Sequence, residues 1–312
     1  MNIKDKILAD LIMKLVSHTK TGRGDFVYYK YFRYWQKKGV NIIPNHYYQP
    51  IPDISELETD VYRQKSDLSG INMNDKKQLL LLKIFLKYQK EYDAFKNIPP
   101  RIDDQVDSCF YLRNYAFDGV DALSYYCLVR MLKPKKIIEV GSGWSTKIAA
   151  LASLKNMETE LTCIEPYPQP ILTKGFPGLK KLITEKVEKV PVEFFKKLGK
   201  NDILFIDTSH TVKIGSDVNY LILDILPILS QGVYIHIHDI FFPENYPELW
   251  VKDEYRFWNE QYLLHAFLIF NNRFEVILTN RYLSDNYLTN LKKTFPKSPF
   301  FEGVSFWIKK IK

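Results

Sequence analysis

The sequence predicts an α/β fold organised around an open, mostly parallel sheet, with a mainly helical N-terminal extension before it. Three observations lead to this fold class. Short apolar runs alternate with stretches of helical periodicity through the last two thirds of the 312 residues. One run, at 136–140, leads through a glycine turn into a helix, as at the opening of nucleotide-binding α/β domains. Four runs end in an acidic residue, so their carboxylates are expected to meet at the sheet edge where ligands bind.

The stretch from 136 to 146 is predicted to form a strand, a tight turn and the start of a helix. Its strand, 136–140, is rich in β-branched apolar residues, which is typical of a strand buried on both faces. Gly141 and Gly143 lack a Cβ, so the backbone of the turn can approach a ligand closely. Ser145 and Thr146 are expected to cap the helix that follows.

The acidic residue within this stretch argues against a phosphate-bearing ligand. Glu139 lies two residues before Gly141, where its charge would repel a pyrophosphate. A dinucleotide-binding turn also needs a third glycine, and Thr146 occupies that position here. The residues therefore favour a ligand that carries positive charge.

The segment Glu139-Val-Gly-Ser-Gly-Trp-Ser-Thr146 resembles motif I of the class I S-adenosylmethionine (SAM)-dependent methyltransferases, whose cofactor carries a sulfonium and an ammonium. The resemblance covers residues 105–312 and implies a Rossmann-like, seven-stranded, mostly parallel sheet with an antiparallel last strand, which 304–308 resembles. By the same resemblance, Glu165 binds the ribose of SAM. The residues expected to contact SAM are Glu139, Gly141, Ser142, Gly143, Ser145, Thr146, Glu165 and Asp207.

The other elements of the core are expected to alternate between strands and helices. Further strands are predicted at 161–165, 182–183, 203–207, 233–238, 274–279 and 304–310, with helices at 117–132, 215–229 and 254–270. Glu165, Asp207 and Asp239 end three of these strands, so they are expected to lie with Glu139 at one edge of the sheet.

The chain is expected to divide into an extension, residues 1–100, and a methyltransferase core, residues 101–312. Apolar residues recur at helical spacing over 3–17, which predicts an amphipathic helix. Asn74 or Asp75 can cap a second helix, and a pair of prolines ends it before the core. The extension is interpreted as an acceptor lid or an oligomerisation element.

The residues after the strand at 203–207 carry the predicted catalytic chemistry. An alcohol does not ionise unaided near neutral pH, so methyl transfer to oxygen needs a base or a metal. His210 follows Asp207 by three residues, and histidine titrates in the range that suits a general base. In the metal-dependent catechol-type methyltransferases, which this segment resembles, the matching aspartate holds a metal and the position of His210 carries the base.

A second group of residues raises the possibility of a metal site. Asp207, His238 and Asp239 are predicted to hold one ion, Mg²⁺ or another divalent metal, with His210 as the alternative to His238. Ile240 stands where the catechol-type enzymes have asparagine, so the third ligand departs from the pattern of that family. The alternative is that His238 and Asp239 form a metal-free hydrogen-bonded pair that positions the acceptor.

Aromatic residues in two separate segments are predicted to bind the methyl acceptor, and their ring faces suit a sugar. The first segment is made extended by its prolines, and its alternative interpretation is a rigid connector packed on the core. The second segment follows Asp239 and is interpreted as a lid or acceptor wall. The acceptor residues predicted in and around these segments are His46, Tyr47, Tyr48, His236, Tyr246 and Trp250.

Composition restricts the partners of the chain. Its net charge is +8, and residues 1–100 hold 17 Lys and Arg against 11 Asp and Glu, or +6. This excess is interpreted as a solvated helical face, or as attraction to an acidic substrate or an anionic membrane surface. Without a sustained basic stripe, no nucleic-acid partner is expected. No apolar run is long enough to span a bilayer, and three cysteines without disulfide or metal spacing predict a reducing, cytoplasmic setting. Peripheral membrane contact and a homo-oligomer are left open.

Together these features predict a SAM-dependent methyltransferase that modifies a hydroxyl of a small polar acceptor, a sugar or glycoconjugate. The first alternative is a small-molecule N-methyltransferase that needs no metal. The second is a catalytically silent SAM-fold protein that binds a partner through its basic N-terminal region.

Overall fold

The computed structural model describes residues 3–18, 20–23, 26–98 and 109–312, and the chain forms two compact units. The smaller unit comprises residues 1–61 and Pro247–Phe257, and the larger unit comprises Tyr62–Tyr246 and Trp258–Lys312. Among the described residues, none of the helices combines the length and apolar character needed to cross a bilayer.

The smaller unit contains the predicted amphipathic helix, α1, at Ile3–Ser17. Its other elements are the antiparallel hairpin of β1 (Lys20–Arg23) and β2 (Phe26–Tyr29), the helix α2 (Phe32–Lys37), the 3₁₀ turn η1 (Ile54–Glu56) and the short helix α11 (Glu248–Lys252). The helix α3 (Thr59–Arg63) spans the division between the two units.

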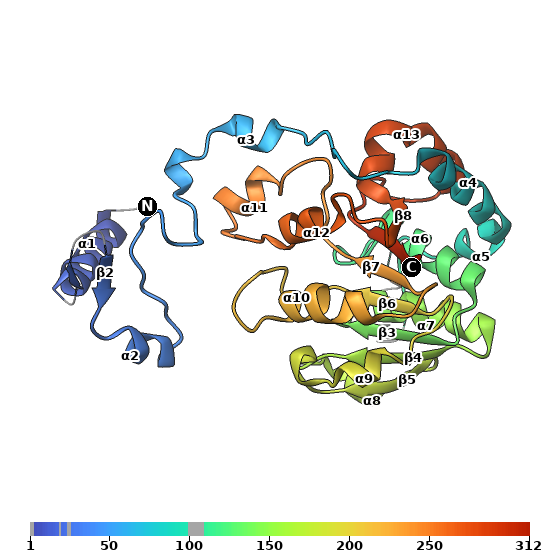
Figure 1. Ribbon diagram of the computed structural model, residues 1–312, viewed down its shortest axis with the longest axis horizontal. Coiled ribbons are helices and arrows are strands. Elements are labelled where there is room, and N and C mark those ends of the chain that lie inside the picture. The colour runs from blue at the N-terminus through green and yellow to red at the C-terminus, as the bar shows by residue number, and fades with distance from the viewer. Residues whose placement is uncertain (1–2, 19, 24–25, 99–108) are drawn as a thin grey trace. The chain divides into compact units, whose positions relative to one another are not determined.

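The larger unit is built on a seven-stranded sheet in the order β5-β4-β3-β6-β7-β9-β8 (Figure 1). In that order the strands are Leu179–Ile183, Glu160–Ile164, Lys136–Val140, Ile203–Ile206, Tyr234–Ile237, Phe306–Lys310 and Phe274–Thr279. The last strand of the chain, β9, is antiparallel to both of its neighbours, whereas all other pairs are parallel. The predicted Rossmann-like sheet with an antiparallel last strand is therefore confirmed.

The strand β3, which lies inside the sheet between β4 and β6, is buried on both faces, as its β-branched sequence predicts. Ile137 packs into the hydrophobic cluster on one face of the sheet, whereas Ile138 and Val140 pack into the cluster on the other face. Successive side chains of a strand point to opposite faces, so an uninterrupted apolar run needs helices on both sides.

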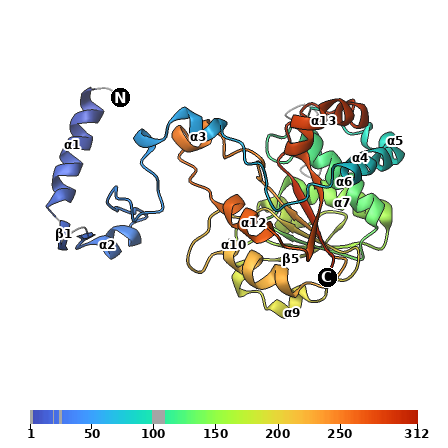
Figure 2. The same ribbon diagram turned by 45° about the horizontal axis from the view of Figure 1, so that its top comes forward.

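Helices cover both faces of the sheet (Figures 1 and 2). One layer holds α4 (Asp75–Phe85), α5 (Gln89–Tyr92), α6 (Gly119–Leu132), α7 (Trp144–Asn156) and α13 (Asn280–Thr294). The other holds α9 (Val192–Phe195), the continuous segment α10 (Asp217–Asn219), η5 (Tyr220–Ile225) and η6 (Leu226–Ile228), and α12 (Glu260–Leu268). Two short elements, α8 (Pro170–Lys174) and η4 (Val187–Lys189), flank β5 in the chain.

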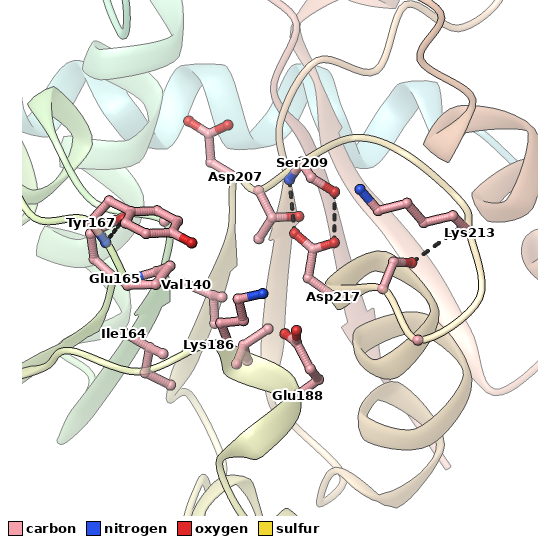
Figure 3. Close-up of a pocket in the computed structure, with 16 residues that line it drawn as sticks. Val140, Ile164, Glu165, Tyr167, Lys186, Glu188, Asp207, Ser209, Lys213 and Asp217 are labelled. Carbon is pink, nitrogen blue, oxygen red and sulfur yellow. Dashed lines mark hydrogen bonds between the residues drawn. The ribbon is translucent and has the colours of Figure 1, made fainter. Parts of the chain in front are cut away.

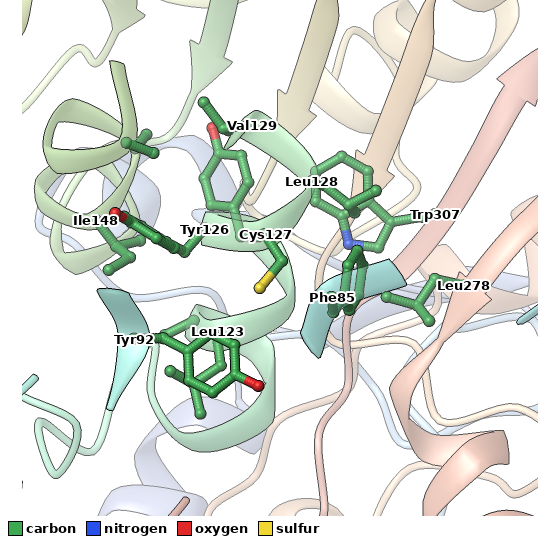
Figure 4. Packing of buried hydrophobic residues seen from close by; sticks show 14 of the residues in the cluster. Phe85, Tyr92, Leu123, Tyr126, Cys127, Leu128, Val129, Ile148, Leu278 and Trp307 are labelled. Carbon is green, nitrogen blue, oxygen red and sulfur yellow. The ribbon is translucent and has the colours of Figure 1, made fainter. Parts of the chain in front are cut away.

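The helix α4 and the helix α5 belong to the hydrophobic core of the larger unit. Phe85 and Tyr92 are buried in the same cluster as Trp307 of β9 and Leu128 of α6 (Figure 4). The expected boundary at residue 100 would separate these helices from the sheet that they cover. In the structure the compact unit instead begins at Tyr62.

Two helices near the end of the chain differ from the sequence prediction. The helix expected at 254–270 is shorter, because α12 begins only at Glu260 and the residues up to Phe257 belong to the smaller unit. The helix α13 was not predicted, and its buried apolar side chains are only Leu283 and Leu291. Such a sparse pattern is too weak to reveal a helix from periodicity alone.

Candidate functional site

The carboxyl ends of β3, β4, β6 and β7 lie side by side at one edge of the sheet. Gly141, Glu165 and Asp207 directly follow the first three of these strands, and Asp239 follows β7 by two residues. The amide of Gly141 donates to the last carbonyl of β4 at 3.0 Å, and that of Asp207 donates to the last carbonyl of β3 at 2.9 Å. The strand ends thus bring three of the four predicted acids to one rim.

The fourth acid, Glu139, points into the protein instead. It lies inside β3 with no exposed surface, on the side of the strand that faces α7. The hydroxyls of Ser145 and Thr146 donate to its Oε1 at 2.6 and 2.8 Å. Burial raises the pKa of Glu139 to about 8, against the opposing effect of these two hydrogen bonds. A direct contact of Glu139, Ser145 and Thr146 with the cofactor does not fit this arrangement, in which the three side chains support the turn from beneath.

The glycine turn brings two strands together and leaves open space beside them. Gly141 has φ +79°, and a Cβ there would lie 1.7 Å from the carbonyl oxygen of Asp207. Only glycine tolerates both conditions. A Cβ on Gly143, in contrast, would meet nothing within 4 Å among the described residues. The turn therefore combines close packing at Gly141 with an open approach at Gly143.

A cavity of about 430 Å³ opens at this edge (Figure 3). Its lining includes four acidic side chains and two lysines, which suits a ligand with positive charge. The charged residues of the lining are Glu165, Glu188, Asp207, Asp217, Lys186 and Lys213. Of the residues expected to contact SAM, Gly141, Glu165 and Asp207 line the cavity, and Ser142 reaches it through Glu165.

The carboxylate of Glu165 is held in place by backbone amides. The amide of Tyr167 donates to its Oε1 at 2.8 Å, and the amide of Ser142 donates to its Oε2 at 3.3 Å. Each oxygen keeps a further lone pair, and paired hydroxyl groups of a ribose are suitable donors to them. The position of Glu165 at the end of β4 thus agrees with its predicted role.

Two features of this cavity were not anticipated from the sequence. Asp217 accepts hydrogen bonds from the amide and the hydroxyl of Ser209, at 2.9 and 2.6 Å, which folds the loop after β6 against the cavity. The buried hydroxyl of Thr208 finds no hydrogen-bond partner within the described part of the chain. A buried hydroxyl without a partner is costly, and a polar ligand in the cavity would relieve that cost.

The loop after β6 also places His210 among three carboxylates. Its Nε2 lies 3.3 Å from Oδ1 of Asp207 and 3.5 Å from Oδ2 of Asp239, and its Nδ1 lies 2.9 Å from Oε2 of Glu260. His210 and Glu260 are buried, whereas Asp207 also lines the cavity. The cluster of His210, Asp207, Asp239 and Glu260, called the His210 cluster below, therefore adjoins the cavity through Asp207.

The charges of the His210 cluster shift the pKa values of its members. Burial acts to lower the pKa of His210, but hydrogen bonds to Asp207 and Glu260 outweigh it and raise the pKa well above the usual range. Burial acts to raise the pKa of Asp207, but the charges of His238 and His210 bring it down to about 2. The cluster thus favours an imidazolium paired with carboxylates.

Of the three predicted metal ligands, Asp207 and Asp239 lie together, whereas His238 lies outside their group. One ligand atom from each of Asp207, His210 and Asp239 lies within 4.8 Å of the others, whereas His238 is absent from this group. Nε2 of His238 is 3.9 Å from Asp239, and its ring packs 5.0 Å from that of Phe117. The ring of His238 stacks on that of His236, so it lies on the same face of the sheet as that residue of β7. The backbone changes direction at Asp239, which has φ +55°.

Sequence reasoning missed Glu260, which is 50 residues from His210 and is the first residue of α12. Neither a motif nor a strand end marks this residue, and its role follows only from the packing of α12 on the loop after β6. Trp258 was missed as well, and its ring lies 4.3 Å from the ring of His210.

Two predicted acceptor residues are buried in the larger unit. His236 has no exposed surface, stacks 3.9 Å from Phe205 and pairs its Nε2 with the hydroxyl of Ser305 at 2.9 Å. A direct contact between His236 and an acceptor does not fit this position, because the residue lies inside β7 rather than at its tip. Tyr246 is also buried, and its hydroxyl accepts from the amide of Gln261 at 3.1 Å.

The other predicted acceptor residues belong to the smaller unit. His46, Tyr47 and Tyr48 form one aromatic group, with ring centres 4.2 Å apart for the first pair and 4.4 Å apart for the two tyrosines. The guanidinium of Arg256 lies over the ring of Trp250, 4.7 Å from its centre, in a cation–π contact. An acceptor contact of these four residues stays a prediction.

Comparison with known proteins agrees with this geometry. Residues 138–240 match the model of a family described as a methyltransferase domain. An uncharacterised protein of Archaeoglobus fulgidus is 34% identical over 169 residues, which are 51% of this chain and 75% of that protein.

Solved structures similar to this chain include methyltransferases. The plantazolicin methyltransferase BpumL, in complex with a desmethylPZN analogue and SAH, has a TM-score of 0.44 and 16% identity over 76% of this chain and 99% of its own. The O-methyltransferase TomG of Streptomyces achromogenes, in complex with SAM, has a TM-score of 0.38 and 9% identity over 74% and 89%. At these values the likeness carries no inference about substrate. The strand order, the motif at 139–146 and the family match over residues 138–240 together identify a methyltransferase domain of the class I SAM-dependent type in this chain.

Proposed function

We propose that this methyltransferase transfers the methyl group of SAM to a hydroxyl of a small polar acceptor, a sugar or glycoconjugate, with His210 as general base. The observation that carries the proposal is the position of His210, with two carboxylates at Nε2 and Glu260 at Nδ1. A hydroxyl must lose its proton for transfer, whereas a neutral amine can attack without a base. A buried, oriented imidazole at the cavity edge therefore favours an oxygen acceptor.

The residues around the cavity fit SAM. When bound, SAM supplies a methyl group on a positively charged sulfur. Glu165 offers two oriented oxygens to the ribose hydroxyls, and the unpartnered hydroxyl of Thr208 offers a further hydrogen bond. The open space at Gly143 leaves the turn accessible.

His210 is oriented to take a proton at Nε2. The hydrogen bond to Glu260 assigns the proton of the neutral ring to Nδ1, which leaves the lone pair of Nε2 facing Asp207 and Asp239. The proton of the acceptor hydroxyl would go to this nitrogen as the oxygen bonds to the methyl carbon, and the methyl–sulfur bond would break to release S-adenosylhomocysteine. The surrounding carboxylates favour the imidazolium, so His210 can take this proton only after Nε2 has lost its own. Methyl transfer is therefore expected to rise with pH over the range in which His210 deprotonates.

A divalent ion at Asp207 and Asp239 is part of the proposal. Two carboxylates at one edge are hard oxygen ligands of the kind that Mg²⁺ prefers. Such an ion supplies positive charge that lowers the pKa of the acceptor hydroxyl. We expect EDTA treatment to lower methyl transfer at least about tenfold and added MgCl₂ to restore it. Calorimetric titration with S-adenosylhomocysteine (SAH) should be unaffected by EDTA, and an unchanged transfer rate would remove the ion from the mechanism while leaving the base.

Trp258 is proposed as the ring platform for the acceptor. Its side chain is half-buried and its ring tilts over His210, where an apolar sugar face would bring a hydroxyl close to the base. We expect Trp258→Ala to raise the KM for the acceptor by up to about tenfold, because stacking of this kind contributes about 0.5–1.5 kcal/mol. Trp258→Phe should recover most of the affinity, and initial-rate kinetics measure both. Equal KM values for all three proteins would place the acceptor elsewhere.

Transfer from SAM with a labelled methyl group tests the proposal across acceptor classes. Free sugars, sugar phosphates, glycosides and catechols form the hydroxyl panel, and primary and secondary amines of similar size form the matched panel. We expect products only from the hydroxyl panel, and mass spectrometry locates the methyl group. Transfer to amines alone, retained in His210→Ala, would establish the N-methyltransferase alternative instead.

A further inference from the structure

The helix α1 presents an apolar stripe to solvent. Ile7, Leu8, Leu11, Ile12 and Leu15 recur along one side of the helix, and between 49% and 63% of each side chain's surface is exposed. Val16 is the only buried residue of the helix. Large apolar side chains in such a continuous stripe are unusual on a surface that meets only water.

The opposite side of α1 carries charged side chains. Lys6 and Asp10 lie on the side of the helix away from the stripe, whereas Lys14 borders the stripe beside Ile7. Lys4 lies in line with the stripe at the N-terminal end of the helix. At 15 residues and with five charges, the helix is too short and too polar to cross a bilayer, in line with the absence of spanning helices among the described residues. Its pattern is that of a helix lying in an interface plane.

Positive charge is concentrated on the segment that contains this helix. Residues 1–38 hold nine Lys and Arg against three Asp, or +6, which is most of the net charge of +8. The rest of the smaller unit, residues 39–61 and 247–257, holds two Lys and Arg against seven Asp and Glu, or −5. The charge is therefore segregated rather than spread over the unit. Tyr31 and Tyr34, both largely exposed, lie in the same basic segment.

We infer that α1 and the basic segment up to residue 38 dock the enzyme on an anionic membrane surface. An apolar stripe enters the boundary between headgroups and acyl chains, and neighbouring lysines and arginines meet the negative lipid headgroups. Exposed tyrosines are typical of that boundary. Two copies of the same segment, each at +6, would repel one another, so charge favours lipid over self-association. The inference concerns a surface apart from the cavity and does not depend on the identity of the acceptor.

Vesicle co-sedimentation of the full chain tests this inference. We expect binding to phosphatidylcholine vesicles with about 30% phosphatidylserine, weak binding to phosphatidylcholine alone, and loss of binding in high salt. Leu11→Glu should weaken binding at least about tenfold, and Lys6→Glu combined with Lys14→Glu should do the same. Leu80→Glu is the matched control, because Leu80 is an equally exposed leucine on helix α4 of the larger unit. It should bind vesicles like the unchanged protein.

Other occupants of the stripe give different results. Sedimentation velocity without lipid would show a dimer that Leu11→Glu separates if the stripe joins two copies. A drop in the melting temperature of Leu11→Glu, with no vesicle binding by the unchanged protein, would mean that the stripe packs within the chain. Either result, or equal binding to both kinds of vesicle, would overturn the inference. SAH titration of each variant verifies that the larger unit remains folded.

Discussion

Replacing His210 by alanine is expected to lower methyl transfer by about 10²- to 10⁴-fold, the usual contribution of a general base. The substitution removes the atom proposed to take the proton, whereas the lining of the cavity proposed for SAM does not include His210. The affinity for SAH should therefore stay the same. Initial rates with a hydroxyl acceptor from the panel, and calorimetric titration with SAH on the same preparation, measure the two quantities separately.

Glu260→Gln provides the matched control for this prediction. Glutamine keeps the size of the side chain and removes the charge that orients and stabilises the ring of His210. We expect a loss of about 10- to 100-fold in kcat, with little change in KM, as for other residues that orient a functional histidine. Glu260→Asp keeps the carboxylate on a shorter side chain, so it should retain part of the activity that Glu260→Gln loses. Full activity in His210→Ala would rule out His210 as the base, whatever Glu260 does.

Gly141→Ala is expected to destabilise the larger unit by at least about 3 kcal/mol. A positive φ costs a residue with a Cβ about 1–3 kcal/mol, and overpacking costs a similar amount. At Gly141 both apply, because the Cβ would overlap the carbonyl oxygen of Asp207 at 1.7 Å. Urea unfolding followed by circular dichroism measures the change.

Gly175→Ala separates the two causes. Gly175 has a similar φ, +74°, but a Cβ there meets nothing within 4 Å among the described residues. The decrease in the free energy of unfolding of Gly175→Ala should therefore reflect backbone strain alone, about 1–3 kcal/mol. If both substitutions cost the same, the close approach of β3 and β6 at Gly141 would not be as tight as described.

The sheet was predictable because each of its main strands is a short apolar run that local sequence patterns reveal. The run at 136–140 is apolar on both faces, and the turn at Gly141 and Gly143 fixes the direction of the chain into α7. Glu165 and Asp207 could be placed at the ligand edge because parallel strands end on the same side. Position along a strand therefore suffices for part of the site.

The remainder of the site depends on contacts between distant segments. Glu139 ends an apolar run like the other acids, yet its side chain turns inward to Ser145 and Thr146. Glu260 reaches His210 only because α12 packs against the loop after β6. Neither the direction of a side chain nor the docking of a helix is encoded in local spacing. The sequence therefore could not decide whether His238 or His210 lies closer to both Asp207 and Asp239.

Calorimetric titration of SAH into the unchanged protein and into Glu165→Ala tests most directly whether the cavity at the ends of β3, β4 and β6 is the cofactor site. We expect one SAH per chain with micromolar affinity, and about a 10²-fold weaker affinity in the variant, because a carboxylate hydrogen bond contributes about 1.5–3 kcal/mol. Glu188→Ala, which removes another acid of the same cavity, should cost less. Absence of binding, or equal affinity in Glu165→Ala, would contradict the assignment of the cavity.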